Sequence, residues 1–339
     1  MPSSPSHGRP HCLGAPMNFK IRTMTFGVCL ATTLLAAPMS VIAQTYPAKP
    51  IRMVLALGGG GETLARFIGQ KMGESMGQPV IIDPQPAAAG VVGANMVAKA
   101  APDGYTFLYA ATNSQVYRLV LSRNTPYDPV KDFTSISLLS DAVLVVAVPP
   151  NSPIKNMRDY VEQAKGGKLF YGTSGVGTSH HLSGEILQLA ANIKLTHVPF
   201  KDPNLVATEV IADRLTSGFG IFGTMFQHHT AGKLRIIAIN NSKRYGRTPD
   251  IPTLSEGVPG YEPPPGWNGF FGPANLPRPI VLRLNTEIHK ASTAPDMKER
   301  FDQLGFIMTL STPEEVDQAI KRDLVRAAKV VKDAGIPVE

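Results

Sequence analysis

The chain has 339 residues, of which 43% are hydrophobic and 17% charged, and its formal net charge is +7. This length predicts two domains, and the hydrophobic content excludes a disordered chain. The 31 glycines and 30 prolines follow no period, which excludes collagen-like and low-complexity chains, and no repeat of about 20–50 residues is present.

The first 43 residues have the features of a cleavable signal peptide with extra leader. Lys20 and Arg22 form a basic stretch, an uncharged and mostly apolar run follows, and Val41-Ile42-Ala43 gives the small-x-small pattern of a cleavage site. The mature chain then begins near Gln44, and Met17 is an alternative start. The apolar run is too short for a membrane span. We therefore expect an exported protein.

Removal of this leader changes the chemistry of the chain. Both cysteines, Cys12 and Cys29, lie in it, so the mature chain has no disulfide, thiol nucleophile or cysteine metal site. Val28, before Cys29, is not the small residue that a lipoprotein site requires, so a soluble form is favoured over a lipid-anchored one. The leader holds three basic residues and no acidic one, so the net charge falls to +4 over residues 44–339. This mild, scattered charge does not predict a nucleic-acid partner.

The mature chain repeats a short apolar run, a turn and a helical stretch. The near-continuous apolar run over 51–57 is typical of a strand buried on both faces, helical spacing follows over 64–72, and a second strand is expected over 80–82. This β-α-β pattern predicts an α/β fold with a parallel sheet and helices on both faces. Downstream, we expect helices over 93–101, 156–164, 181–191 and 205–212 and a long one after Thr312, and strands over 106–111, 143–148, 169–173, 195–198 and 234–238.

Two stretches have the composition of crossings between domains. One covers residues 128–143 and the other, rich in proline, covers 260–268. Two crossings predict a first domain made of both chain ends and a second domain inserted between them.

Gly58–Gly61, followed by Glu62 and Thr63, joins the first predicted strand to a helix. Such a loop presents backbone N–H groups beside the positive end of a helix, which favours an anion. A P-loop needs a lysine that is missing here, and a dinucleotide fingerprint needs a glycine or alanine where Thr63 stands. The remaining interpretations are a carboxylate-type anion site and a tight turn without a ligand.

A second loop of this kind covers residues 172–181 and is rich in glycine and hydroxyl side chains. Small residues let the backbone approach a ligand closely. The loop lacks the Gly-x-Ser-x-Gly pattern of a nucleophile elbow. Ser179 and His180 are adjacent on the predicted helix and point about 100° apart, so we expect no catalytic pair and no catalytic residue.

The histidine pairs His180-His181 and His228-His229 lack the i, i+4 spacing that brings two ligands to one metal ion. We interpret them as helix-start and surface histidines and expect neither a metal ion nor another cofactor. The acidic residues Asp103, Asp128, Asp132 and Glu185 are interpreted as cap and turn residues. The turn of small residues over 87–93 has two interpretations. It either contributes to the same ligand site as the two loops, or it lets a helix pack closely on the sheet.

Several segments, in this order, resemble the substrate-binding proteins of tripartite tricarboxylate transporters, the Bug-type periplasmic binding proteins. The resemblance runs from Tyr46 to the C-terminus. Its most specific segments are residues 98–106, 127–133, Gly177-Thr178-Ser179 with His181-Leu182, 197–201, 231–235 and 249–253. No single segment would suffice, but the ordered set is specific.

The resemblance implies a periplasmic-binding-protein fold of type II, a Venus flytrap of two doubly wound α/β domains with a hinge. The domains would comprise residues 44–142 with 263–339, and residues 143–262. A small carboxylate would bind between them, held mainly by backbone N–H groups and hydroxyls. The implied ligand-binding positions are Gly58, Gly59, Gly60, Gly61, Thr63, Ala89, Gly90, Thr112, Asn113, Gly175, Gly177, Thr178, Ser179, His180, Phe200, Lys201 and Gly220.

This chain departs from the family pattern at three places. Val54-Leu55 and Glu62 replace the usual Pro-Phe and Asp of the first loop, and Phe200-Lys201-Asp202-Pro203-Asn204 replaces a Tyr-Lys-Gly-Gly segment. Gly220 stands where the family often has an aspartate that can hold a ligand amine, which predicts no preference for amino acids. Nearby aromatic side chains either form the core or extend the site for a longer or aromatic carboxylate; they are Phe219, Phe222, Phe226 and Trp267.

The expected function is that of a monomeric binding protein that captures a small organic carboxylate and delivers it to membrane permease subunits. Three alternatives stay open at this point. They are an exported hydrolase that uses Ser179 on a carboxylate ester, a ligand-sensing partner of a membrane receptor, and a member whose altered loop around Asp202 no longer binds.

Overall fold

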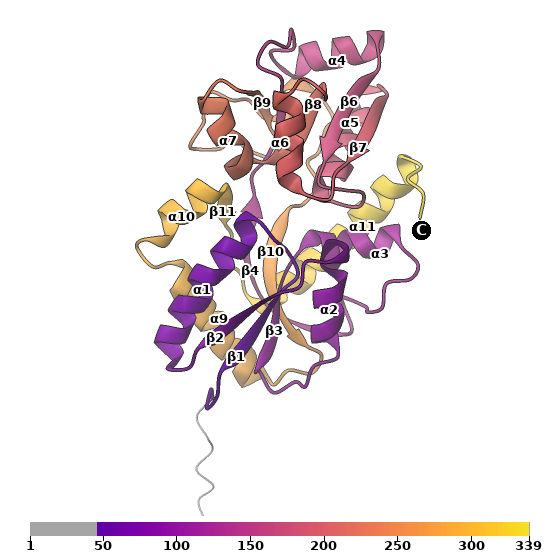
Figure 1. The fold of residues 1–339 in the computed structure, drawn as a ribbon. Helices are drawn as coiled ribbons and strands as arrows, with labels where there is room; N and C mark the ends of the chain where they lie inside the picture. Colours follow the sequence, from indigo (N-terminus) through magenta and orange to yellow (C-terminus); the bar gives the residue numbers. More distant parts are fainter. Residues whose placement is uncertain (1–45, 339) are drawn as a thin grey trace, which may run out of the picture. The chain divides into compact units, whose positions relative to one another are not determined.

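The computed structural model describes residues 46–338. The predicted leader, its cleavage site and both cysteines lie outside these residues. The chain forms two β-sheets, one of six strands and one of five (Figure 1). In the described part, no helix is both long enough and apolar enough to cross a membrane.

The six-stranded sheet, called the first sheet, has the strand order β11-β4-β10-β3-β1-β2. Its strands are β1 (Ile51–Leu55), β2 (Val80–Pro84), β3 (Thr106–Ala111), β4 (Phe133–Ala142), β10 (Trp267–Pro273) and β11 (Phe306–Met308). β1 is parallel to β2 and β3, which confirms the predicted β-α-β unit. β10 is antiparallel to β3 and β4, and β11 is antiparallel to β4, so the predicted parallel sheet also contains antiparallel strands. The reason is that β4 leads to the other sheet and β10 returns from it beside β4.

The five-stranded sheet, called the second sheet, has the order β7-β6-β8-β5-β9. Its strands are β5 (Leu144–Val148), β6 (Leu169–Thr173), β7 (Leu195–Pro199), β8 (Ser217–Ile221) and β9 (Arg235–Ile239). β6 is parallel to β7 and β8, whereas β5 is antiparallel to β8 and β9. Each sheet thus contains a parallel trio, β3-β1-β2 and β8-β6-β7, whose strands end at a common edge.

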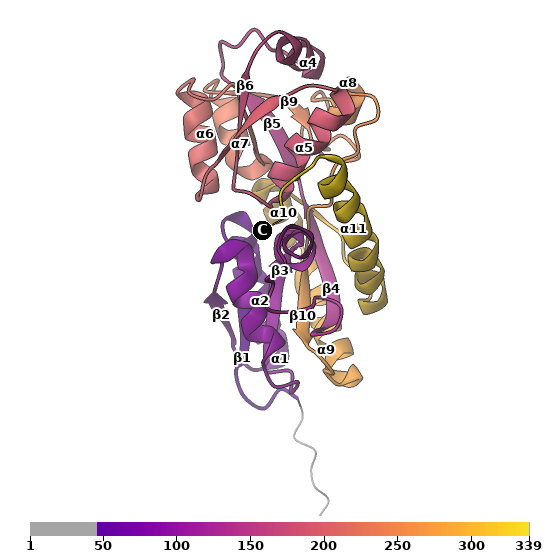
Figure 2. The same cartoon turned by 90° about the vertical axis from the view of Figure 1, so that its right-hand side faces the viewer.

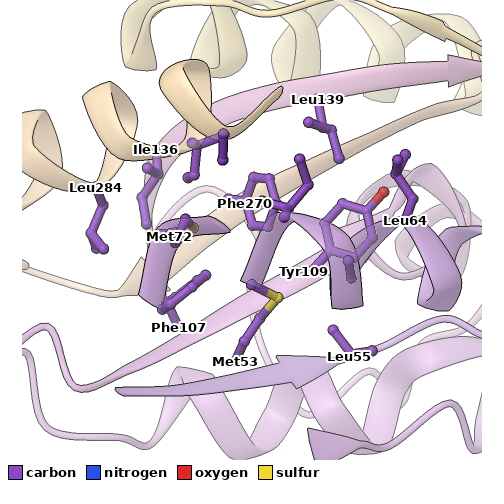
Figure 3. Packing of buried hydrophobic residues seen from close by; sticks show 14 of the residues in the cluster. Met53, Leu55, Leu64, Met72, Phe107, Tyr109, Ile136, Leu139, Phe270 and Leu284 are labelled. Atoms are coloured by element: carbon purple, nitrogen blue, oxygen red, sulfur yellow. The ribbon is translucent and has the colours of Figure 1, made fainter. Parts of the chain in front are cut away.

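Helices cover both faces of the first sheet because its strands are apolar on both faces. On one face, α1 (Gly60–Met76), α9 (Arg278–Ser292) and α10 (Met297–Leu304) pack with Met53, Phe107 and Phe270 (Figure 3). On the other face lie α2 (Val91–Ala98), α3 (Arg118–Leu121) and α11 (Pro313–Asp333). Figure 2 shows α11 running beside β4 toward α5 (Ser179–Ala191), and it contacts both.

The second sheet is covered in the same way. α5 packs on one face with α4 (Met157–Gly166) and α8 (Leu254–Gly257). The other face carries α6 (Pro203–Ile211) and α7 (Phe222–Thr230). Burial of apolar side chains in these layers is the main favourable contribution to folding.

Several helix starts follow the predicted cap chemistry. The Asn156 side chain accepts hydrogen bonds from the backbone N–H groups of Arg158 and Asp159 at the start of α4. Thr312 and Glu315 form a capping box at the start of α11, with Pro313 in its first turn. These side chains satisfy N–H groups that have no partner inside their helix.

The chain passes from β4 to β5 through Val143. Its N–H donates to the Gly305 carbonyl at 2.8 Å, and its carbonyl accepts from the N–H of Phe222 at 2.8 Å. Most of the stretch over 128–143, which its composition marked as a crossing between domains, forms strand β4 over residues 133–142. The domain limits at 142/143 and 262/263 remain predictions.

The sequence left open whether four aromatic side chains belong to the core or extend the ligand site. Most of them are core residues. Phe219, Phe222 and Trp267 are buried, and Phe226 stacks on Phe222. The Trp267 indole N–H donates to a carboxylate oxygen of buried Asp323 at 2.8 Å. Trp267 lies in one apolar cluster with Leu182, which belongs to α5 beside the second sheet.

Candidate functional site

The first group of predicted site residues lies where β1, β2 and β3 end. Because these strands are parallel neighbours, the loops that follow them share one edge of the first sheet. Gly58 and Gly59 are exposed, and Gly59 precedes α1 with a φ of 66°, in the left-handed region that favours glycine. The N–H of Thr63 donates to the Gly59 carbonyl at 3.2 Å, so Gly60 and Gly61 form the open first turn of α1.

The second loop at this edge is the short 3-10 turn η1 (Ala88–Gly90). Its three residues all have positive φ values, 53°, 54° and 92°. Left-handed backbone costs an alanine about 1–2 kcal/mol, and such strain is concentrated at functional sites. A Cβ on Gly90 would lie 3.1 Å from the carbonyl carbon of Ala56, so this turn packs directly against the end of β1.

Beyond β3, Thr112 is buried and leads into the π-helix η2 (Asn113–Tyr117). π-Helical turns are rare and frequently mark functional sites. Sequence analysis missed Gln115 in this turn. Its amide is buried, and neither polar atom has a hydrogen-bond partner among residues 46–338. The available signal was the run of four polar residues, Thr112 to Gln115, that follows the buried strand β3.

The second group lies where β6 ends, at the edge that β6 shares with β7 and β8. Gly175 and Gly177 have φ values of 119° and 76°. The Thr178 hydroxyl donates to the Gly175 carbonyl at 2.8 Å and accepts from the N–H of His181 at 3.3 Å. Thr178 thereby caps α5, whose first residue is Ser179.

One hydrogen bond joins the two groups. The Ser179 backbone N–H, at the start of α5, donates to Oδ1 of Asn113 at 3.3 Å. A Cβ on Gly177 would lie 3.1 Å from the Leu121 side chain, which belongs to α3 beside the first sheet. The loops after β3 and β6 therefore meet, although they are 66 residues apart in the sequence at this bond.

His180 and His181 lie in the first turn of α5, as expected of helix-start histidines, but they are buried. They are only 5% and 6% exposed. His180 Nδ1 is hydrogen-bonded to Ser174 Oγ at 2.6 Å, and its buried Nε2 has no partner in the described part of the chain. Burial lowers the pKa of His180 to about 4, so its imidazole is neutral at neutral pH.

Three further predicted ligand-binding positions, Phe200, Lys201 and Gly220, lie near the end of the edge that β6 shares with β7 and β8. Lys201 is exposed, and Phe200 packs near Gly172, where a Cβ would lie 3.3 Å from its ring. Gly220 lies inside β8, where a Cβ would lie 2.6 Å from the end of the Met225 side chain in α7. In the altered loop, the Asp202 side chain accepts from the N–H of Asn204 at 2.9 Å and caps α6.

The arrangement is suited to hold an anion. It combines the N-termini of α1 and α5, each with a partial positive charge, with hydroxyl groups and glycine backbone. Within residues 46–338, no three His, Cys, Asp or Glu side chains gather as a metal site would require.

Comparisons with known proteins identify the family of the chain. Residues 64–336 match the model of the tripartite tricarboxylate transporter family receptor, TctC. The chain is 29% identical to the protein BugT of Bordetella pertussis over 325 residues, which cover 94% of this chain and 99% of BugT.

Two solved structures of the same fold contain ligands according to their descriptions. R. palustris Rpa4515 with adipate has a TM-score of 0.80 and 27% identity, over 86% of this chain and 99% of that one. MatC from Rhodopseudomonas palustris with bound malate has a TM-score of 0.75 and 26% identity, over 84% and 100%. These matches confirm the resemblance and the type II fold that the sequence predicted. The chain therefore belongs to the tripartite tricarboxylate transporter receptor family, a family of Bug-type periplasmic solute-binding proteins.

Proposed function

We propose that this protein captures a small organic carboxylate between the two groups of loops and delivers it to a tripartite-type membrane permease. The ligand contacts would come from Gly58–Gly61 with Thr63, from Ala89 and Gly90, from Thr112 and Asn113, and from the loop over 175–180. In this proposal the protein is exported through its cleavable signal peptide and acts in the periplasm as a monomer without a cofactor. The predicted domains close about their hinge when the ligand binds.

The observation that carries the proposal is the bond from the Ser179 N–H to Asn113 Oδ1. It places an oxygen acceptor from one loop group on a backbone donor in the first turn of α5. A carboxylate oxygen is an acceptor of the same kind and is stronger because of its charge. A ligand with this chemistry would interact with both groups at once, which gives it higher affinity for the closed arrangement.

A dicarboxylate fits the two helix starts better than a monocarboxylate does. Adipate and malate, the ligands of the two similar structures, each carry two carboxylates. The N-termini of α1 and α5 offer two separate sites for negative charge. Amino acids are not expected to bind well, because position 220 has no carboxylate for a ligand amine.

Hydrolysis through Ser179 has no comparable support. The His180 imidazole is hydrogen-bonded to Ser174 and not to Ser179, and a catalytic triad would need a carboxylate on its other nitrogen. We therefore propose binding without catalysis.

Thermal unfolding of the purified protein tests the proposal, with adipate, malate and succinate as probes. Dimethyl adipate controls for charge, and aspartate differs from succinate by one ammonium group. At 100 times its dissociation constant, a ligand adds about 2.7 kcal/mol to the unfolding free energy, which raises the melting temperature by at least a few degrees.

Stabilisation by a dicarboxylate and not by its neutral ester supports the proposal. The absence of stabilisation by every carboxylate would overturn it. Stabilisation by aspartate above that by succinate would contradict the inference from Gly220.

A further inference from the structure

Three aromatic rings are stacked beneath the Gly175–Gly177 turn. The rings of His181 in α5 and His197 in β7 have centroids 4.3 Å apart and planes 25° apart. Tyr171 in β6 also stacks with His197, with ring centroids 4.9 Å apart and planes 28° apart. Neither histidine has a role in the function proposed above.

Both imidazoles are hydrogen-bonded to the segment that forms the turn. His197 Nε2 lies 2.6 Å from the Thr173 hydroxyl, and that hydroxyl also accepts from the N–H of Gly175 at 3.2 Å. His181 Nδ1 accepts from the N–H of Gly177 at 3.4 Å. The histidines therefore hold both ends of the turn.

The acceptor role of His181 Nδ1 determines its tautomer. A neutral imidazole that accepts at Nδ1 carries its proton on Nε2. This nitrogen lies 3.6 Å from Glu185 Oε1, and the same oxygen accepts from the Tyr171 hydroxyl at 2.7 Å. Glu185 lies inside α5 and is thus not the cap or turn residue that the sequence suggested.

We propose that His181 and His197 are positioning residues that hold the Gly175–Gly177 turn in its binding form only while both imidazoles are neutral. The affinity for a carboxylate then falls in mildly acidic solution. The effect on affinity rests on the function proposed above, whereas the effect on the turn does not.

The physical reason is the loss of an acceptor. A proton on His181 Nδ1 would face the Gly177 N–H, so a hydrogen bond becomes a contact between two donors. A second charge on His197 would be repelled across the 4.3 Å stack. These penalties act at the turn itself, whereas the attraction of a buried imidazolium for an anionic ligand acts over a longer distance.

The surrounding groups agree with neutral rings near pH 7. Burial, and in second place His181, lowers the pKa of His197 to about 4. Burial also lowers the pKa of His181, and Glu185 opposes this. Tyr171 from β6 stays uncharged because burial raises its pKa, and β8 contributes the Phe219 ring against Tyr171. We therefore expect the change below the ordinary histidine pKa of about 6.5.

The test is calorimetric titration of the full protein with adipate at pH 7.5 and 5.5. His181→Asn keeps an acceptor near the Nδ1 position but does not titrate, and His228→Asn removes a histidine of α7 as a matched control. From pH 7.5 to pH 5.5, we expect the Kd for adipate to rise about fivefold more in wild type than in His181→Asn. A factor of this size corresponds to the loss of one neutral hydrogen bond. The ratio of the two proteins cancels the protonation of adipate itself. Equal pH profiles for wild type and His181→Asn, or tighter wild-type binding in acid, would overturn the inference.

A second measurement does not depend on a ligand. In ¹⁵N NMR spectra of the free protein at pH 7.5, His181 should show a protonated Nε2 and an unprotonated Nδ1. At pH 5.5, the Gly177 amide of wild type and of His228→Asn should exchange with solvent faster than the pH dependence of base-catalysed exchange predicts. The Gly177 amide of His181→Asn should not. If adipate does not bind but this pattern appears, the proposed ligand is wrong and the role of the histidines stands. The opposite tautomer, or no change at Gly177, would show that the histidines do not control the turn.

Discussion

Gly223 and Gly305 approach each other so closely that a Cβ on Gly305 would lie 2.5 Å from the backbone nitrogen of Gly223. Gly223 is in the first turn of α7, beside the second sheet, and Gly305 ends α10, beside the first sheet. The Gly305 carbonyl also accepts from Val143, the residue through which the chain crosses between the sheets. Backbone therefore packs on backbone at this crossing, with no side chain between them.

Gly223→Ala tests this contact. A Cβ at position 223 would lie 2.6 Å from the Leu304 carbonyl carbon, which cannot move away as a flexible side chain could. We expect the unfolding free energy in urea to fall by about 1–3 kcal/mol, although alanine favours helix over glycine. Gly166→Ala is the control, since a Cβ there meets nothing within 4 Å. Equal or higher stability of Gly223→Ala would show that the contact is not tight in solution.

Gly90→Ala tests the packing of η1 on β1. The new Cβ would meet the Ala56 carbonyl, and φ is 92°. The combined strain should lower the unfolding free energy by at least about 2 kcal/mol. Gly77→Ala separates the two causes, since its φ is 70° and a Cβ there meets nothing within 4 Å. It should cost about 1 kcal/mol, and an equal loss in both variants would contradict the close approach.

Asn113→Asp separates stability from affinity. The carboxylate would accept from the Ser179 N–H at the positive end of α5, which should raise the unfolding free energy by about 0.3–1 kcal/mol. The same charge would repel an anionic ligand, so the Kd for adipate should rise by at least about tenfold.

The control for this variant is Asn151→Asp, which adds the same charge in the turn after β5. Because β5 is antiparallel to β8, this turn lies at the opposite edge of the second sheet. The control should bind adipate like wild type. If both variants bind like wild type, the Asn113 region does not contact the ligand.

His180 should make stability depend on pH. Burial lowers its pKa to about 4 in the folded protein, against about 6.5 in the unfolded chain. The unfolded state then binds more protons, so stability is full above pH 6.5 and is lost as the pH falls toward 4. At pH 5 the loss from this group is about 2 kcal/mol.

The measurement is urea unfolding of wild type and His180→Gln between pH 7.5 and 4.5. The variant should lose less stability over this range. Asp141 acts in the opposite sense, because burial, with Asp323 next, raises its pKa to about 6. It is present in both proteins, so their difference isolates His180. Equal slopes would show that His180 is not buried as a neutral ring.

Local signals predicted the elements that form the site. The apolar run at β1, the glycines before α1 and the hydroxyl-rich loop before α5 all lie where periodicity and loop chemistry had placed them. Within each sheet, the grouping of the loops also follows from a simple rule, because neighbouring parallel strands end at one edge. Asn156 and Thr312 were identifiable as caps because the cap and its N–H partners lie within three residues.

The features that sequence analysis missed depend on distant partners. His181 and His197 are 16 positions apart and meet because α5 packs against β7. The antiparallel direction of β10 follows from its return beside β4, which no local pattern reveals. The bond between Asn113 and Ser179 likewise requires both loops to be folded.

Trp267 gives the molecule a built-in optical reporter. It is the single tryptophan of the chain, it is 3% exposed, and it shares its apolar cluster with Leu182 of α5. A movement that withdraws α5 from the first sheet would change the packing around this one indole. The intrinsic fluorescence of the unlabelled protein would therefore follow the opening and closing of the two sheets in real time.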